Sequence, residues 1–91
     1  MVTQNPARSP FDAIADPTRR AILDHLRGGE MNAGDIARRF PVSRPAIAKH
    51  VRVLRQAGLL KQRRQAQTIF YALDPKGLAD VDSWLAPYRL F

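Results

Sequence analysis

The chain contains no cysteine. This absence excludes a disulfide framework, a thiolate zinc site, an iron–sulfur cluster and a cysteine nucleophile. The sequence also has no glycine-rich phosphate loop, no H-E-x-x-H pair and no nucleophile elbow. With 91 residues the chain forms a single domain, which leaves little room for a deep catalytic cavity. We therefore expect a protein that is not an enzyme and that carries neither a metal nor another cofactor.

Long hydrophobic runs are missing as well. No apolar stretch approaches the roughly 20 residues that cross a membrane. The first ten residues hold two prolines and no apolar core, unlike a secretory signal. The hydrophobic content of 45% is nevertheless that of a globular domain and not of a disordered basic tail. We expect a cytoplasmic, nucleoid-associated protein without a membrane partner.

A third absence is local, because residues 36–73 contain no Asp or Glu. The same stretch holds nine Lys and Arg residues, whereas the rest of the chain holds six basic and eight acidic residues. The net charge of +7 therefore comes from this one basic segment. A surface that only aids solubility usually mixes both signs. A one-sided basic segment inside a folded domain is typical of a protein that binds a polyanion.

Capping residues divide the first part of the chain into short helices. Residues 1–9 are predicted to form a flexible arm, and the first helix begins near Pro10, with an apolar stripe at Phe11, Ile14 and Ala15. Asp16 and Pro17 start a second helix, since Asp caps helices well and Pro is tolerated in the first turn. Asn32 caps a third helix in the same way.

The fourth helix is predicted to start at Ser43 and to be closed by Gly58. Its apolar residues are Ile47, Val51 and Leu54, at helical spacing. Only Pro41 and Val42 are expected to join it to the third helix, which is the short link of a helix-turn-helix.

The apolar period changes after the fourth helix. Residues 59–64 and 68–73 look like two strands around a basic turn, and Asp74 and Pro75 start a last helix. The order helix, helix, helix, helix, strand, strand, helix predicts a mainly helical winged helix-turn-helix with a β-hairpin wing. The expected parts of the domain at residues 10–91 are the helix-turn-helix at about 32–58, the wing at about 59–73 and the terminal helix at about 75–91.

A polar face lies opposite the apolar stripe of the fourth helix when residues are placed at 100° intervals. On this face Lys49 and Arg52 can reach guanine acceptors or phosphates, and Gln56 can reach a base edge or a phosphate. Phosphates are also favoured at the positive N-terminal end of the helix. The candidate DNA-binding residues of this helix are Ser43, Arg44, Pro45, Ala46, Lys49, Arg52 and Gln56.

The hairpin supplies a second group of candidate DNA contacts. They are Arg63, Arg64, Gln65 and Gln67. Arginine at a hairpin tip can enter a narrow minor groove or follow the phosphate backbone, although a solubilising charge on an edge strand is an equal alternative for each residue. His50 is interpreted as a hydrogen-bonded residue of helix packing and not as a ligand.

Two stretches of the sequence resemble the ArsR/SmtB family. Residues 16–23, D-P-T-R-R-A-I-L, are similar to the D-P-T-R-R-x-I-L opening of the family, and residues 43–60 resemble its recognition helix. The resemblance implies a homodimeric bacterial repressor that often regulates its own operon and dimerises through its first and last helices. The third helix lacks a thiol and the last helix lacks a histidine, which places the chain in the metal-independent, SdpR-like branch. Ala66 stands where a wing glycine is common in the family.

The C-terminal composition independently favours a dimer, because three of the seven aromatic residues lie among the last eight residues. The alternative is that these aromatic side chains complete the core of the monomer. Candidate interface residues are Phe11, Val81, Trp84, Leu85 and Tyr88. The predicted function is that of a homodimer that binds an inverted repeat in double-stranded DNA and represses transcription. Alternatives are a module for an acidic protein partner and a sensor with an atypical metal or small-molecule site. The sequence does not identify an inducer.

Overall fold

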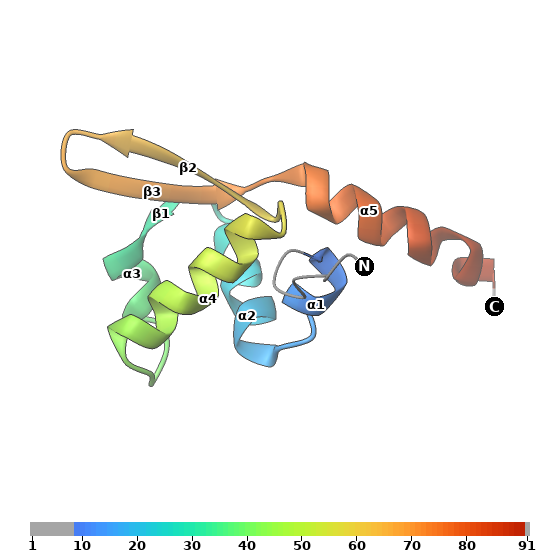
Figure 1. Ribbon diagram of the computed structural model, residues 1–91, viewed down its shortest axis with the longest axis horizontal. Coiled ribbons are helices and arrows are strands. Elements are labelled where there is room, and N and C mark those ends of the chain that lie inside the picture. The colour runs from blue at the N-terminus through green and yellow to red at the C-terminus, as the bar shows by residue number, and fades with distance from the viewer. Residues whose placement is uncertain (1–8, 91) are drawn as a thin grey trace, which may run out of the picture.

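The computed structural model describes residues 9–90 as a mainly helical domain with a three-stranded antiparallel sheet (Figure 1). The predicted fold class is confirmed, whereas nearly all of the predicted arm lies outside the described residues. The elements in chain order are α1 (Pro10–Ala13), α2 (Pro17–Leu26), β1 (Met31–Asn32), α3 (Ala33–Ala37), α4 (Arg44–Gln56), β2 (Leu60–Gln65), β3 (Thr68–Leu73), α5 (Pro75–Leu85) and the 3-10 helix η2 (Ala86–Leu90).

Each predicted helix cap is present in the structure. The side chains of Asp16, Asn32, Ser43 and Asp74 all accept a hydrogen bond from a backbone N–H in the first turn of the helix that follows. The distances are 3.0, 2.8, 3.2 and 3.0 Å, respectively. These bonds satisfy N–H groups that have no partner within the helix, so local chemistry defines where four of the helices begin.

The sheet joins the hairpin to the helical part of the domain. Strands β2 and β3 pair from Leu60↔Leu73 to Gln65↔Thr68, and β1 pairs with the other edge of β3. The sequence did not predict β1, because a two-residue strand is too short to show a period. In Figure 1 the tip of the hairpin extends beyond the helices. β1 pairs with the edge of β3 that β2 leaves free, and so it connects the hairpin to the helical part of the domain.

The hairpin turn consists of Ala66 and Gln67, which lie between the last paired residues of β2 and β3. Ala66 has a φ of 55°, and it is the only non-glycine residue with a positive φ among residues 9–90. The sequence departs from a common glycine at this position, and the turn accepts the left-handed conformation at a cost of about 1–2 kcal/mol.

The hydrophobic core lies where α2, α3 and α4 meet the start of the sheet. The three residues of α4 that were predicted to face inward are buried, together with Ile22 and Leu26 of α2 and Ile36 of α3. The apolar stripe predicted for the first helix is only partly buried: Ile14 packs against the core and Phe11 is 43% exposed, while the fully buried residue is Ala13, which the stripe did not include. With only four residues, α1 makes about one turn, and its packing partners decide which side chain faces inward.

The last helix is shorter than the sequence predicted. α5 ends at Leu85, and the chain continues to Leu90 as the 3-10 helix η2. Pro87 explains this ending, since proline has no N–H to donate and its ring collides with the carbonyl four residues earlier in an α-helix.

The first turn of α5 contacts the backbone just after the end of α4. The N–H of Gly77 donates a hydrogen bond to the carbonyl of Gly58 at 2.8 Å. A Cβ at residue 77 would lie 2.7 Å from the carbonyl oxygen of Gly58 and 3.0 Å from that of Ala57. Both distances are shorter than carbon–oxygen van der Waals contact, so only glycine at position 77 allows this approach.

Replacing Gly77 with alanine is therefore expected to lower the free energy of unfolding by about 1–3 kcal/mol, as overpacking does in other cores. Urea denaturation at a fixed protein concentration measures the change. Gly28→Ala is the matched control, since its Cβ would lie 3.7 Å from the nearest atom, at ordinary contact distance. Equal stability of the two variants would contradict the close approach.

Candidate nucleic-acid interface

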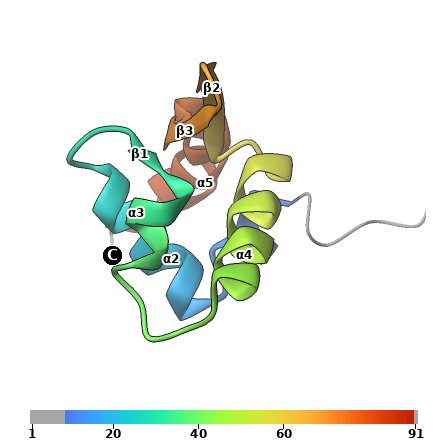
Figure 2. The same ribbon diagram turned by 90° about the vertical axis from the view of Figure 1, so that its left-hand side faces the viewer.

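The polar face of α4 is open to solvent. Of the seven residues that the sequence predicts to contact DNA from this helix, six are exposed and Ala46 is half-buried. The Ser43 side-chain oxygen accepts the N–H of Ala46 at 3.2 Å, which leaves its own hydroxyl hydrogen available to a phosphate. Figure 2 shows α4 at one side of the domain, with the hairpin above the helices.

The link between α3 and α4 is longer than predicted. α3 ends at Ala37, so residues 38–43 join it to α4, and not Pro41 and Val42 alone. The N–H groups of Arg39 and Phe40 donate to the carbonyls three residues earlier, at 3.0 and 3.3 Å. The end of the predicted third helix is thus a series of tighter turns, and the two helices still pack as a helix-turn-helix.

The hairpin and α4 enclose a groove of about 220 Å³. It is lined by Ala33, Ala48, Val51, Arg52, Arg55, Gln62 and Tyr71. Arg55 was not among the predicted contacts, because it lies on the flank of α4 that faces the hairpin and not opposite the buried stripe. Only the position of the hairpin shows that this flank belongs to the same basic surface.

The two arginines of the hairpin lie on opposite faces of the sheet. Arg64 shares the inner face, beside the groove, with Gln62 and the buried Leu60, because strand residues alternate between faces. Arg63 lies on the outer face, where its guanidinium forms an ion pair with Glu30. Arg64 has no acidic partner among residues 9–90.

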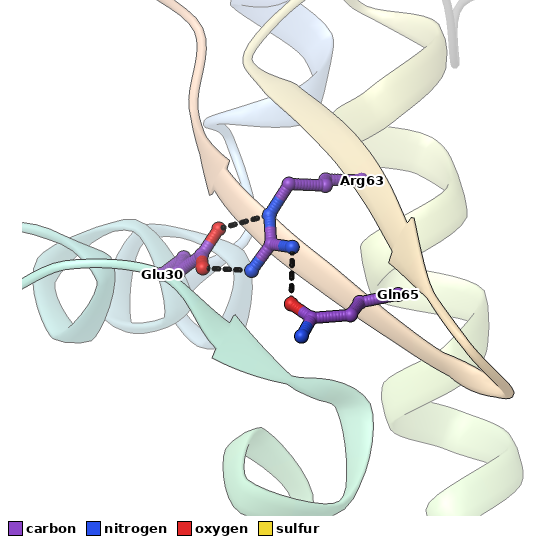
Figure 3. Close-up of polar contacts among 3 residues, drawn as sticks. All are labelled: Glu30, Arg63 and Gln65. Atoms are coloured by element: carbon purple, nitrogen blue, oxygen red, sulfur yellow. Dashed lines mark hydrogen bonds and ion pairs between the residues drawn. The ribbon is translucent and has the colours of Figure 1, made fainter.

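The Arg63–Glu30 pair includes several contacts (Figure 3). Nε and Nη2 of Arg63 donate to the two carboxylate oxygens of Glu30, and Nη1 donates to Oε1 of Gln65 at 2.7 Å. The guanidinium also lies over the ring of Phe70, 4.7 Å from its centroid. The hydrogen bonds from Arg63 lower the pKa of Glu30, and Glu30 raises the pKa of Arg63.

Acids just outside the basic segment neutralise part of it. Arg38 pairs with Asp35, as Arg63 pairs with Glu30. The other seven Lys and Arg residues of the segment at 36–73 have no acidic partner among residues 9–90. Four of these seven, Arg44, Lys49, Arg52 and Arg55, lie on α4, and Arg64 lies on the face of the hairpin beside it. Most of the unpaired basic charge is therefore on the helix and its side of the hairpin.

Arg19 connects three helices. Its Nε and Nη2 donate to the carbonyls of Ala13 and Asp12 at 2.7 and 3.3 Å, and its Nη1 lies 3.3 Å from Nδ1 of His50 on α4. Because a guanidinium can only donate, Nδ1 of His50 is the acceptor. This contact confirms the interpretation of His50 as a hydrogen-bonded packing residue.

The D-P-T-R-R stretch thereby has a structural explanation. Arg19 and Arg20 of α2 both satisfy carbonyls at the C-terminal end of α1, since Arg20 donates to Ile14 at 2.9 Å. The N–H of Arg19 is the main reason that the pKa of Asp16 lies below its ordinary value. Asp16 thus stays ionised as a helix cap at neutral pH, and this contribution to stability is lost only as the pH falls through that lowered pKa.

Within the part of the chain that the structure describes, no three side chains of the metal-ligating types lie together. None of the helices described is long and apolar enough to cross a membrane.

Comparison with known proteins agrees with this geometry. The profile of a family described as a helix-turn-helix domain matches residues 14–63. The transcriptional repressor SdpR of Bacillus subtilis (strain 168) is 48% identical over 75 residues, which are 82% of this chain and 83% of SdpR. A crystal structure of a possible transcriptional regulator for arsenical resistance is 38% identical with a TM-score of 0.81, over 88% of this chain and 83% of that one. An ArsR family transcriptional regulator also has a TM-score of 0.81, at 30% identity, over 97% and 93% of the two chains.

The fold and the basic surface define a winged helix-turn-helix protein that binds DNA and regulates transcription. The chain belongs to the ArsR/SmtB family of transcriptional repressors. As the sequence predicted, it is not an enzyme.

Arg19→Ala is expected to lower the free energy of unfolding by about 1–3 kcal/mol, because three hydrogen bonds are lost and two carbonyls at the end of α1 lose a donor. Chemical denaturation measures the change. The neighbouring Arg20→Ala removes a single exposed bond and is expected to cost less. Equal losses in the two variants would show that Arg19 does not hold the three helices together.

Proposed function

We propose that the protein is a homodimeric repressor that reads an inverted-repeat operator with α4 and contacts the flanking DNA backbone with its hairpin. The proposal rests on the exposed basic face of α4, whose Lys and Arg side chains have no acidic partner among residues 9–90. This face lies beside the groove that α4 and the hairpin form together. The same face is the one that the sequence predicts to contact DNA. We propose that the operator includes the protein's own promoter region and that the protein acts in the cytoplasm.

The residues of α4 divide into two roles. Ser43 and Arg44 lie at the positive end of a 13-residue helix and, with Arg52 and Gln56, suit phosphate contacts. The other three candidates are proposed to contact base edges and so to contribute to the choice of DNA sequence; they are Pro45, Ala46 and Lys49. The two small residues let the helix backbone approach the major groove, and Lys49 can donate to guanine acceptors.

Dimerisation is proposed through α1, α5 and η2. The rings of Phe11 and Trp84 are nearly perpendicular, with centroids 5.9 Å apart, and the centroids of Trp84 and Tyr88 are 5.1 Å apart. Trp84 is still 56% exposed and Tyr88 53%, and Leu85 beside them is also exposed. Exposed aromatic clusters of this kind are typical of protein interfaces. Val81, half-buried on the same helix, is the fifth proposed contact.

The symmetry of such a dimer specifies its operator. Two copies related by a twofold axis place their α4 helices about 34 Å apart, so that each enters the major groove of one half-site. The operator is therefore expected to be an inverted repeat. Footprinting on the DNA that flanks the gene tests this, and binding that does not weaken steeply with salt would contradict it.

Lys49→Ala is expected to weaken operator binding more than nonspecific binding, whereas Arg64→Ala is expected to weaken both to the same extent. The reason is that Lys49 faces base edges and Arg64 faces the backbone. Affinities for operator and scrambled duplexes at one salt concentration measure the difference. Equal effects of the two substitutions would show that these roles are wrongly assigned.

Trp84→Ala is expected to weaken the dimer at least tenfold, since a central aromatic residue commonly supplies much of an interface's binding energy. Sedimentation equilibrium measures the dissociation constant, and circular dichroism checks that the monomer remains folded. Leu90→Ala is the control, because Leu90 is 93% exposed and is not among the five proposed interface residues. An unchanged dissociation constant for Trp84→Ala would exclude this interface.

A further inference from the structure

The outer face of the hairpin carries a cluster that the contacts of α4 do not use. We call it the outer clasp, and it consists of Glu30, Arg63, Gln65 and Phe70 (Figure 3). Arg63 is its centre, with an ion pair to Glu30, a hydrogen bond to Gln65 and a cation–π contact with Phe70. These contacts occupy all three guanidinium nitrogens of Arg63 and one face of its guanidinium plane.

The clasp spans the whole width of the sheet. Glu30 directly precedes β1, Phe70 lies on the central strand β3, and Arg63 lies on β2 at the other edge. Arg63 and Phe70 are direct cross-strand partners, and Phe70 is also the partner of Asn32. β1 pairs with β3 at two positions only. Few backbone contacts therefore hold the hairpin to the body of the domain at this edge, and the clasp adds a side-chain connection there.

The side chain of Arg63 points away from the groove between α4 and the hairpin. Side chains alternate along a strand, so Arg63 and Gln65 share the outer face while Arg64 lies on the inner face toward α4. In this position Arg63 already has a carboxylate as its counter-ion. A phosphate would have to displace Glu30 to bind the same guanidinium.

The main effect of the clasp is on orientation. Exposed ion pairs contribute little to stability, and both partners here are partly exposed. A bidentate arginine–carboxylate pair, however, has a defined geometry. The contacts with Gln65 and with the ring of Phe70 further restrict the orientation of the guanidinium. The cluster therefore restricts the angle between the hairpin and the body of the domain.

We propose that Glu30 and Arg63 are positioning residues for DNA recognition. They hold the hairpin at the angle at which Arg64 and Gln67 meet the DNA, and Arg63 itself does not contact a phosphate. This inference rests on the proposed function. It also revises the role of Arg63 and Gln65, which the sequence alone groups with the DNA-contacting residues.

The number of phosphates contacted tests the proposal. Each phosphate contact contributes about 0.9 to the slope of log affinity against log salt. Arg64→Gln is expected to lower this slope by about one. Arg63→Gln is expected to weaken operator binding several-fold with an unchanged slope. A slope that falls for Arg63→Gln as it does for Arg64→Gln, or operator binding that does not change, would overturn the proposal.

Exchange of the two charges provides the second test. Arg63→Glu is expected to weaken operator binding, because Glu30 and the new carboxylate repel each other. Adding Glu30→Arg to the same chain is expected to restore most of the affinity by forming the pair in reverse. A direct phosphate contact at residue 63 could not be restored in this way, so failure of the rescue would contradict a positioning role.

A measurement without DNA separates this proposal from the proposed function. In Glu30→Gln the backbone amides of β2 and β3 are expected to exchange hydrogen faster than in the unsubstituted protein, with the rest of the domain unchanged. Unchanged exchange in the hairpin would refute the clasp whether or not the protein binds an operator. If the unsubstituted protein binds no operator, the proposed function fails, and the exchange experiment still decides whether the clasp holds the hairpin.

Discussion

The contact between the backbones of Gly58 and Gly77 is the constraint on which the arrangement of this domain depends. It ties the root of α5 to the end of α4 with a hydrogen bond of 2.8 Å. In the proposed dimer α5 lies at the interface and α4 reads the DNA. The direction in which one helix leaves the other therefore determines how far apart two recognition helices can lie. Two backbones in direct contact have no flexible side chain between them to absorb a change.

Arg19 provides a second connection between the same two functions. It holds the carbonyls at the end of α1, whose Phe11 packs against Trp84 of α5, and it also bonds to His50 on α4. Two sets of contacts thus connect the proposed interface to the recognition helix. One is the backbone contact between Gly77 and Gly58, and the other is the guanidinium of Arg19. The hairpin is held separately by the outer clasp. Each DNA-facing element is consequently fixed by contacts that lie away from the DNA-facing surface.

Features whose determining chemistry is local were predictable from the sequence. The caps at Asp16 and Ser43 act within three residues, and the buried stripe of α4 follows from its period, so both were predictable. Strand β1, the close approach at Gly77 and the Glu30–Arg63 pair were not predictable in this way. Each of these depends on segments that are distant in the chain and meet only after folding. The same limit explains why the polar face of α4 was predicted without Arg55, which joins the basic surface through the position of the hairpin.

The two-residue strand β1 also constrains how this chain can vary. Surface loops usually tolerate insertions and deletions. The loop between α2 and β1 ends at Glu30, whose side chain shares the outer face of the sheet with Phe70 and Arg63. Because strand residues alternate between faces, inserting one residue between Glu30 and Met31, the first paired residue of β1, would turn the carboxylate away from Arg63. Relatives that keep this acid and this arginine are therefore expected to keep the spacing from the acid to the strand, however much the rest of the loop changes in sequence.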